Sequence, residues 1–191
     1  VCDATKPQSG ILRVHISRGE GSKGYLPQMC QSFAVIEVKE LTNNKENISL
    51  HIASQPAHIF AKAKTASSLN YVLAAIEAAE NGADNALLLD KNIVCECANA
   101  NIFWVKNNKL FTPALDLPLI NGSVQNIIMQ NFEVTQAHLP ASELINQDEI
   151  FVTNTNLVTQ NIAKINGYGN IGNIGFATKV KEFVSKSSNF S

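Results

Sequence analysis

The chain has 191 residues, of which 45% are hydrophobic and 16% charged, and its formal net charge is −1 at pH 7. This length can hold one large domain, or a domain with part of a second, around a sizeable core. Scattered basic residues in a nearly neutral chain argue against a nucleic-acid or polybasic membrane surface, and no apolar run approaches the roughly 18 residues of a transmembrane helix.

The N-terminal part predicts two strands joined by a glycine-rich turn. Apolar and polar residues alternate from Ile11 to Ser17, and a second strand is expected from Ser32 to Leu41. The turn between them carries a formal G-x-G-x-x-G, but Tyr-Leu-Pro follows where a dinucleotide site would need a helix to begin. The polar link from Thr42 to Asn47 predicts a boundary within the chain.

The middle of the chain predicts one helix among short strands. After a strand from Ile48 to Ala53, Ser67 or Ser68 is expected to cap a helix that runs to about Glu80. The apolar face of this helix consists of Leu69, Val72, Leu73, Ile76 and Ala79. Further strands are expected at 86–89, 93–96, 102–105 and 109–112, the last two as a hairpin around Asn107-Asn108.

The C-terminal part predicts helices at 124–131, 141–146 and 176–185. Strands are expected at 132–136, 150–153 and 161–165, and the strand at 161–165 is expected to be the last one in the chain. The first amides of the helix at 124 have no partner within the helix, which suits a bound phosphate. A second G-x-G-x-x-G, at 167–172, lacks the later strand with an acidic residue that a dinucleotide fingerprint requires, so we expect a flexible glycine loop.

The cysteines indicate a reducing compartment. Cys95 and Cys97 would share one face of a strand, too close and too parallel for a relaxed disulfide. We therefore expect these two, with Cys2 and Cys30, to be reduced thiols in a cytoplasmic protein. The first seven residues do not form a signal-peptide pattern. The four histidines have no ligand spacing with each other or with the cysteines, so no metal site is expected.

One lysine and one glutamate are candidates for a catalytic site. Lys64 lies just ahead of the predicted helix, and Glu96 lies 32 positions later in an apolar hairpin. A nucleophilic lysine needs partial burial to lower its pKa, and a buried glutamate needs a cationic partner. Pyridoxal phosphate could serve both, as a Schiff base on the lysine and through its ring nitrogen on the carboxylate.

These landmarks together resemble the class IV aminotransferase-like pyridoxal-phosphate enzymes, which include branched-chain aminotransferases, D-amino-acid transaminases and 4-amino-4-deoxychorismate lyases. The resemblance runs from about Ser9 to Gly167. Its specific parts are a lysine eight residues before Val72-Leu73-Ala74, then Glu77-Ala78, the run 82–90, Glu96, Asn101-Ile102-Phe103, Leu110 to Pro113, and Asn121-Gly122. This spacing selects Lys64 rather than Lys62.

The resemblance implies a fold-type IV pyridoxal-phosphate enzyme with a mixed α/β (α+β) fold. Residues 47–191 would form the C-terminal cofactor-binding domain, a mixed sheet with helices. Residues 1–46 would be a remnant of the N-terminal α+β domain, contributing only its last strands. The resemblance also implies a homodimer acting on a small-molecule substrate.

The resemblance also implies roles for individual residues. Lys64 would be the catalytic lysine and Glu96 the partner of the cofactor's ring nitrogen. The backbone amides of Ser123 and Val124, with the hydroxyl of Thr155, would bind the cofactor phosphate.

Four more residues are weaker candidates. Asn99 and Asn101 would flank the cofactor ring, although a role as turn-stabilising amides is almost equally well supported. Arg18 and Lys23 are candidate ligands for the carboxylates of the substrate.

Within the family, the lyase that converts 4-amino-4-deoxychorismate to 4-aminobenzoate and pyruvate for folate synthesis is favoured. The stretches from Ile16 to Tyr25 and from Cys95 to Trp104 are similar to the lyase, and Leu69 stands where branched-chain enzymes have a tyrosine. Two departures are Gln125, where the family usually has an arginine, and the near absence of the N-terminal domain. The alternatives are a branched-chain or D-amino-acid transaminase, and an inactive fragment or binding module.

Overall fold

The computed structural model describes residues 10–24, 26–40, 45–57 and 61–187. Cys2 lies outside these ranges. The chain divides into two units, Val1–Asn44 and Lys45–Ser191, each of which is described by itself. That the first unit is the remnant of a larger α+β domain stays a prediction.

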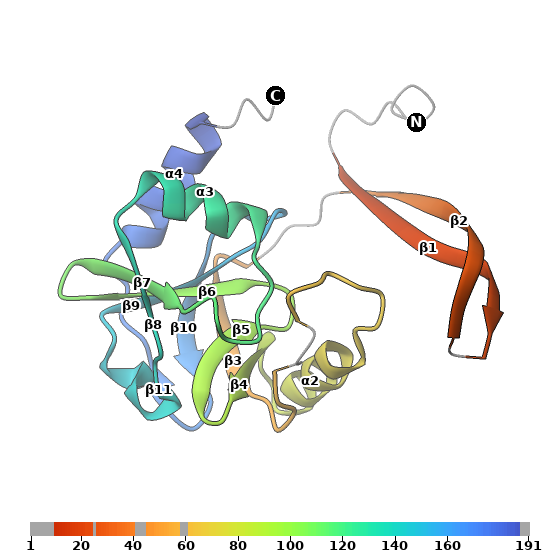
Figure 1. The fold of residues 1–191 in the computed structure, drawn as a ribbon. Coiled ribbons are helices and arrows are strands. Elements are labelled where there is room, and N and C mark those ends of the chain that lie inside the picture. The colour runs from red at the N-terminus through yellow and green to blue at the C-terminus, as the bar shows by residue number, and fades with distance from the viewer. Residues whose placement is uncertain (1–9, 25, 41–44, 58–60, 188–191) are drawn as a thin grey trace. The chain divides into compact units, whose positions relative to one another are not determined.

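The first unit is a twisted antiparallel ribbon of β1 (Ile11–Lys23) and β2 (Leu26–Lys39) (Figure 1). Both strands are longer than predicted, because Gly19 and Gly21 lie within β1 and not in the turn. The register shifts around these glycines, whose φ angles are 77° and 110°. A Cβ on Gly19 would lie 1.7 Å from the carbonyl oxygen of Gln31, so β-bulges explain the glycines.

One face of this ribbon is apolar. Cross-strand partners on it are Leu12 with Val38, Val14 with Ile36, and Ile16 with Ala34. The large side chains of this set are 36–79% exposed. A two-stranded ribbon is at best marginally stable in water, so this face marks a surface that needs to be covered.

The second unit is built on a mixed sheet. Within the described residues the sheet has nine strands in the order β5-β4-β3-β10-β9-β6-β7-β8, with β11 paired to β10. The strands are β3 (Asn47–Ile52), β4 (Asn85–Asp90), β5 (Ile93–Cys97), β6 (Asn101–Lys106), β7 (Lys109–Pro113), β8 (Val134–Ala137), β9 (Glu149–Thr153), β10 (Gln160–Ile165) and β11 (Gly169–Asn170). The pairs β3–β4, β3–β10 and β7–β8 are parallel and the others antiparallel. The predicted mixed fold is therefore confirmed.

The prediction that the strand at 161–165 is the last strand is wrong, because β11 follows it. The glycine loop doubles back at once, so that Gly169 pairs with Ile165 and Asn170 with Lys164. Positive φ angles at Gly167 and Gly169, of 81° and 103°, permit this reversal.

The helices are α2 (Leu69–Glu80), α3 (Ser123–Asn131), the 3₁₀ helix η1 (Ala141–Asn146) and α4 (Phe176–Ser187). In Figure 1, α3 and α4 lie beside each other, and α2 covers a different part of the sheet. Three buried clusters follow from this arrangement. One contains side chains of η1, a second lies beneath α2, and a third joins α3 and α4 to Phe103 and Phe151.

Helix α2 is oriented differently from what its apolar pattern suggests. Its small residues face the sheet, with Ala74 0% and Ala78 1% exposed. The residues that we call the outer stripe of α2, all 40–66% exposed, are Leu69, Val72, Leu73 and Ile76. Helical periodicity identifies a face but cannot say which face is buried when both are apolar, and alanines allow the closest approach to the sheet.

A β-bulge sets the directions of the side chains on β5. Leu88 pairs with Glu96 and Leu89 with Val94, so Cys95 is the extra residue. Cys95 therefore lies in the cluster beneath α2 while Cys97 lies in the cluster that contains η1. The expectation that the two cysteines share a face is wrong, because that alternation holds only for a regular strand.

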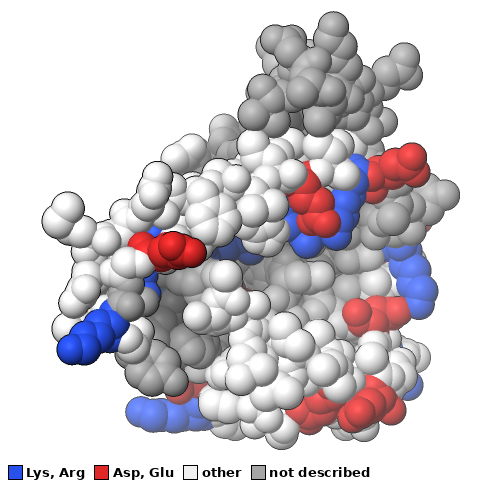
Figure 2. All heavy atoms as spheres, turned by 90° about the vertical axis from the view of Figure 1, so that its right-hand side faces the viewer, with Lys and Arg blue, Asp and Glu red and all other residues white. Residues whose placement is uncertain are grey.

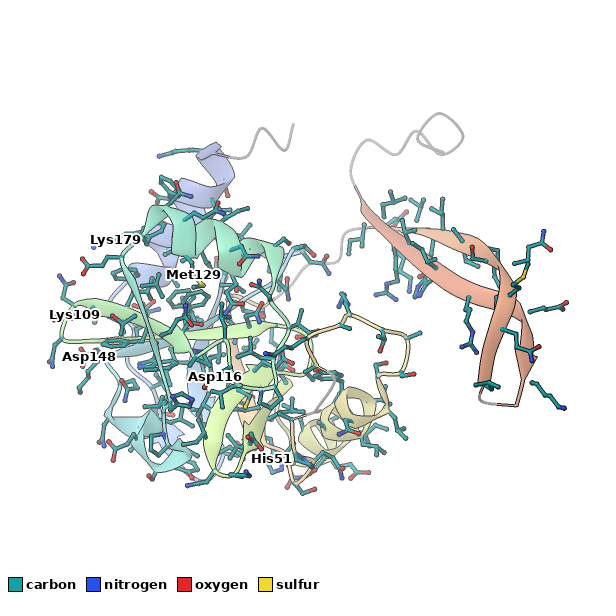
Figure 3. The ribbon with its side chains drawn as sticks, viewed as in Figure 1. His51, Lys109, Asp116, Met129, Asp148 and Lys179 are labelled. Atoms are coloured by element: carbon teal, nitrogen blue, oxygen red, sulfur yellow. The ribbon has the colours of Figure 1, made fainter. Side chains whose placement is uncertain are left out.

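The loop after β3 is fastened to α2 by a carboxylate. Glu77 accepts hydrogen bonds from the Ser54 amide at 3.0 Å and the Ser54 hydroxyl at 2.7 Å, and its Oε1 lies 3.2 Å from His51 Nε2. Figure 3 shows His51 beside this helix. The hydrogen bonds from Ser54 are the main reason why the pKa of Glu77 is lowered. This contact anchors one end of the segment that carries Lys64.

Candidate functional site

Glu96 is a buried carboxylate with two hydrogen-bond donors. It is 2% exposed, and it pairs with Leu88 and alternates with Cys97, so it faces α2. The Tyr71 hydroxyl donates to its Oε1 at 2.6 Å, and the Ile120 amide donates to its Oε2 at 2.9 Å. Burial raises the pKa of Glu96, and both hydrogen bonds oppose that rise. Within the described residues no basic side chain forms an ion pair with it.

Lys64 lies on the exposed segment that leads into α2, so the partial burial expected of a nucleophilic lysine is not found within the described residues. Its positive charge also lowers the pKa of Glu96, so the two groups interact although 32 positions separate them. Of the two neighbouring lysines, Lys64 is the one whose charge acts on Glu96. The structure thus brings together the lysine and glutamate that the sequence singled out. We call Lys64, Tyr71 and Glu96 the Glu96 cluster.

The start of α3 presents free backbone donors. Gly122 is the N-cap residue and Ser123 begins the helix. The amides of Ser123 and Val124 have no acceptor in the part of the chain that the structure describes, as expected for a first helical turn. These amides and the helix dipole suit an anion.

Asn101 supports this helix start. Its Nδ2 donates to the Ile120 carbonyl at 2.6 Å. A Cβ on Gly122 would lie 2.0 Å from Asn101 Oδ1, so the backbone passes close to this side chain only because residue 122 is glycine. Ile120 is thereby held at both ends of its backbone, by Glu96 through N–H and by Asn101 through C=O.

A buried threonine beside Asn101 has an unpaired hydroxyl, which shows whether the site fits a bound phosphate. Thr153 is the direct cross-strand partner of Asn101, so the two side chains share a face of the sheet. Thr153 is 1% exposed, and its Oγ1 has no hydrogen-bond partner among the described residues. An unsatisfied hydroxyl near free helix amides fits an acceptor-rich group such as a phosphate. We call Asn101, Gly122, Ser123, Val124 and Thr153 the α3 cluster.

Thr155, the predicted phosphate donor, lies two residues beyond Thr153 on an exposed turn. Asn154 fixes this turn by accepting hydrogen bonds from the amides of Asn156 and Leu157 at 3.0 and 3.1 Å. Thr155 therefore follows the end of β9 at which Thr153 pairs with Asn101. Its role in binding stays a prediction.

Gln125, one of the departures from the family pattern, is buried. It is 1% exposed, accepts from the Gly122 amide at 3.3 Å and donates to Thr112 Oγ1 at 3.2 Å. Thr112 in turn donates to the Ile102 carbonyl at 3.0 Å. The side chain at position 125 therefore joins the start of α3 to the β6–β7 hairpin.

Three other predicted residues lie apart from these clusters. Asn99 is exposed in the turn between β5 and β6, where its Oδ1 accepts from Asn85 at 2.7 Å, which supports the turn-stabilising interpretation. Arg18 and Lys23 belong to the first unit. Their assignment as substrate ligands stays a prediction.

Sequence reasoning missed Tyr71 and Thr153. Tyr71 precedes Ala74 and Ala78 by three and seven positions, so it belongs to the buried face of α2. That spacing was a usable signal, but only once the alanine face was known to be the buried one. Thr153 showed no signal beyond its place at a strand end.

Other kinds of site have little support. The described residues contain no group of three or more His, Cys, Asp or Glu side chains that could hold a metal ion. Among the described helices none is both long and apolar enough to cross a membrane. Figure 2 shows both acidic and basic side chains among the uncharged ones.

Known proteins were compared with the chain. The family described as Amino-transferase class IV matches residues 1–165. A putative branched-chain-amino-acid aminotransferase of Methanocaldococcus jannaschii is 30% identical over 161 residues, covering 78% of this chain and 56% of that protein. An aminodeoxychorismate lyase of Vibrio harveyi is 28% identical over 167 residues, covering 78% and 61%. The chain thus spans little more than half the length of these relatives.

A solved structure shows the same fold. The putative 4-amino-4-deoxychorismate lyase of Legionella pneumophila superposes with a TM-score of 0.89 at 19% identity, covering 98% of this chain and 73% of that one. Other neighbours with this fold include forms with pyridoxal phosphate and with pyridoxamine phosphate. From the match over residues 1–165 and the shared fold, the chain belongs to the class IV aminotransferase family.

Proposed function

We propose that the second unit is the cofactor-binding domain of a pyridoxal-phosphate enzyme in which Lys64 holds the cofactor. Pyridoxal 5'-phosphate is the cofactor of this family, as predicted, and when bound it supplies an electron sink. The observation that carries the proposal is the buried Glu96 carboxylate, which has two donors but no ion-pair partner among the described residues. A protonated ring nitrogen would supply the missing positive charge.

The α3 cluster would bind the other end of the cofactor. The amides of Ser123 and Val124 would donate to its phosphate, assisted by the helix dipole. Thr155, and the unpaired hydroxyl of Thr153, would add donors from β9. Gly122 and Asn101 would keep the helix start in place.

Two residues would handle protons. Glu96 would hold a proton on the ring nitrogen. With the substrate bound, the free Lys64 Nζ would take the proton from the carbon that bears the substrate amine, and it would deliver a proton to the departing enolpyruvyl group. Aromatisation of the substrate ring would drive the elimination. The substrate is therefore proposed to be 4-amino-4-deoxychorismate, and the products 4-aminobenzoate and pyruvate.

One observation favours the lyase over a transaminase. Position 69, where branched-chain enzymes carry a tyrosine, is a leucine that is 66% exposed on the outer stripe of α2. It offers no hydroxyl to a cofactor. The similarity to the Vibrio harveyi lyase supports the same choice, whereas the similarity to the Methanocaldococcus jannaschii aminotransferase keeps a transaminase as the second candidate.

Substrate tests would separate the candidates. The protein, loaded with pyridoxal phosphate, is incubated with 4-amino-4-deoxychorismate, and separately with paired amino acids and keto acids. Release of pyruvate and 4-aminobenzoate in equal amounts is expected. Amino-group exchange without pyruvate release would instead establish the transaminase. Neither reaction, from a protein that binds the cofactor at Lys64, would favour the inactive fragment.

We also propose that the protein is a homodimer and that the first unit is part of a larger α+β domain. The exposed outer stripe of α2 and the apolar face of the ribbon support these proposals, because apolar surfaces of this kind are usually covered. Light scattering should give twice the monomer mass. A monomer would contradict the dimer.

A further inference from the structure

Tyr71 makes the shortest hydrogen bond to Glu96. Its hydroxyl lies 2.6 Å from Glu96 Oε1, within the range of a charge-assisted bond from a hydroxyl to a carboxylate. The tyrosine belongs to the buried face of α2, and the carboxylate lies on β5 beneath that helix. The bond therefore joins two elements across the cluster that lies under α2.

This bond also affects the charge on Glu96. Burial raises the pKa of the carboxyl, and the hydrogen bond from Tyr71 comes first among the effects that lower it, ahead of the Ile120 amide and the charge on Lys64. Burial and the proximity of Glu96 raise the pKa of Tyr71, so its phenol keeps its proton at neutral pH.

Two further titratable groups among the described residues, both thiols, are the neighbours of Glu96 on β5. Glu96 contributes to the raised pKa of both the Cys95 and the Cys97 thiol, whose main cause is burial. Both thiols therefore stay neutral at physiological pH. Tyr71 is the side chain that donates a hydrogen bond to Glu96, since its other donor is a backbone amide.

We propose that Tyr71 is a positioning residue, which fixes the Glu96 carboxylate in the orientation and the ionised state that hold a proton on the ring nitrogen of pyridoxal phosphate. This inference rests on the proposed function, in which Glu96 faces that nitrogen. Because Leu69 points outward, α2 contributes to the site through the hydrogen bond from Tyr71 to Glu96 and not through a hydroxyl at position 69.

The test compares Tyr71→Phe with Tyr168→Phe. Tyr168 is a half-buried tyrosine of the same unit that packs against the cluster containing η1, so its variant also loses one hydroxyl. Wild type and both variants are titrated with pyridoxal phosphate labelled with ¹⁵N in the ring. Borohydride reduction and peptide mass spectrometry establish that the cofactor is held at Lys64.

Two changes are expected for Tyr71→Phe only. Loss of a hydrogen bond to a charged group weakens cofactor binding about 10-fold. The ring ¹⁵N resonance moves towards the position of a neutral pyridine, because a less stabilised carboxylate takes a larger share of the proton. In a Glu96→Gln background the same Tyr71→Phe change should leave this resonance unmoved.

The outcomes separate the inference from the function on which it rests. If Tyr71→Phe gives the same ¹⁵N resonance as Tyr168→Phe, Tyr71 is only a structural anchor of α2 and the inference is overturned, even if the unfolding temperature drops. If the wild-type protein itself is not labelled at Lys64, the proposed function fails, and the inference about Tyr71 fails with it. A shift in the resonance with an unchanged unfolding temperature supports the inference most directly.

Discussion

The Glu96 cluster and the α3 cluster differ in how far the protein satisfies its own polar groups. Both oxygens of Glu96 accept hydrogen bonds, from Tyr71 and from Ile120. In the α3 cluster the amides of Ser123 and Val124 and the hydroxyl of Thr153 have no partner among the described residues. The protein therefore fixes a negative charge at one place and offers donors at the other, which together suit a ligand with a cationic ring and an anionic tail.

The largest expected effect separates the two neighbouring lysines. Lys64→Ala should abolish the cofactor adduct that borohydride fixes, whereas Lys62→Ala should retain it, because only Lys64 interacts with Glu96. Absorbance and mass spectrometry of the reduced proteins measure the adduct. If Lys64→Ala formed the adduct at the wild-type level, Lys64 would not be the residue that holds the cofactor.

Glu96→Gln should weaken cofactor binding by about 10- to 100-fold, because it removes the charge that complements the ring nitrogen. In the cofactor-free chain, by contrast, Glu96→Gln should increase the stability of the folded state at neutral pH. The folded pKa of Glu96 is raised, so the folded state holds this proton more tightly than the unfolded state.

Stability should consequently fall as pH rises from the ordinary glutamate pKa through the raised one, and Glu96→Gln should lack that fall. Chemical denaturation between pH 4 and pH 8, an interval that begins just below the ordinary glutamate pKa of about 4.3, measures this loss of stability. An equal fall in both proteins would mean that Glu96 is not a buried charge.

Gly122→Ala tests the α3 cluster. The added Cβ would lie 2.0 Å from Asn101 Oδ1, a side chain already tied to Ile120, so we expect a loss of about 1–3 kcal/mol in stability. Cofactor affinity should fall with it, by about 10-fold. Ser123→Ala is the matched control, because it keeps the backbone amide, and it should change affinity by less than about twofold. A larger effect of Ser123→Ala would show that the side chain is the donor.

The smallest effect is expected far from both clusters. Asp84 accepts hydrogen bonds from Ser49 and pairs with Lys45, and the bond from Lys45 is the main reason why its pKa is lowered. A lowered folded pKa stabilises the protein above the ordinary aspartate pKa and loses this effect as pH falls towards the folded value. Asp84→Asn should therefore cost about 1 kcal/mol at pH 7 and less in acid, with cofactor affinity unchanged.

The sequence was most informative where the signal is local. The helix at 69–80, the hairpin around Asn107-Asn108 and the open amides at the start of α3 were predicted, and the structure has all three, although the Ser68 side chain forms no cap hydrogen bond. The choice of Lys64 and Glu96 as partners of one bound cofactor rested on the family resemblance and not on periodicity, and it stays a prediction.

What the sequence did not reveal depends on contacts between distant segments. The bulge at Cys95 exists only relative to β4, and the burial of Ala74 in place of Leu73 depends on what lies beneath α2. The bond from Tyr71 to Glu96 depends on the second of these, the burial of the alanine face of α2. The position of β11 likewise depends on how the glycine loop meets β10.

The bulge at Cys95 has a consequence for chain length. Val94, Glu96 and Cys97 already alternate correctly against Leu89, Leu88 and Leu87, so the pairing of β4 with β5 does not need Cys95. A protein one residue shorter at this point could keep Glu96 facing Tyr71, at the cost of one buried side chain under α2. The interval between Lys64 and Glu96 can therefore vary by a single-residue deletion without moving the carboxylate to the other side of the sheet.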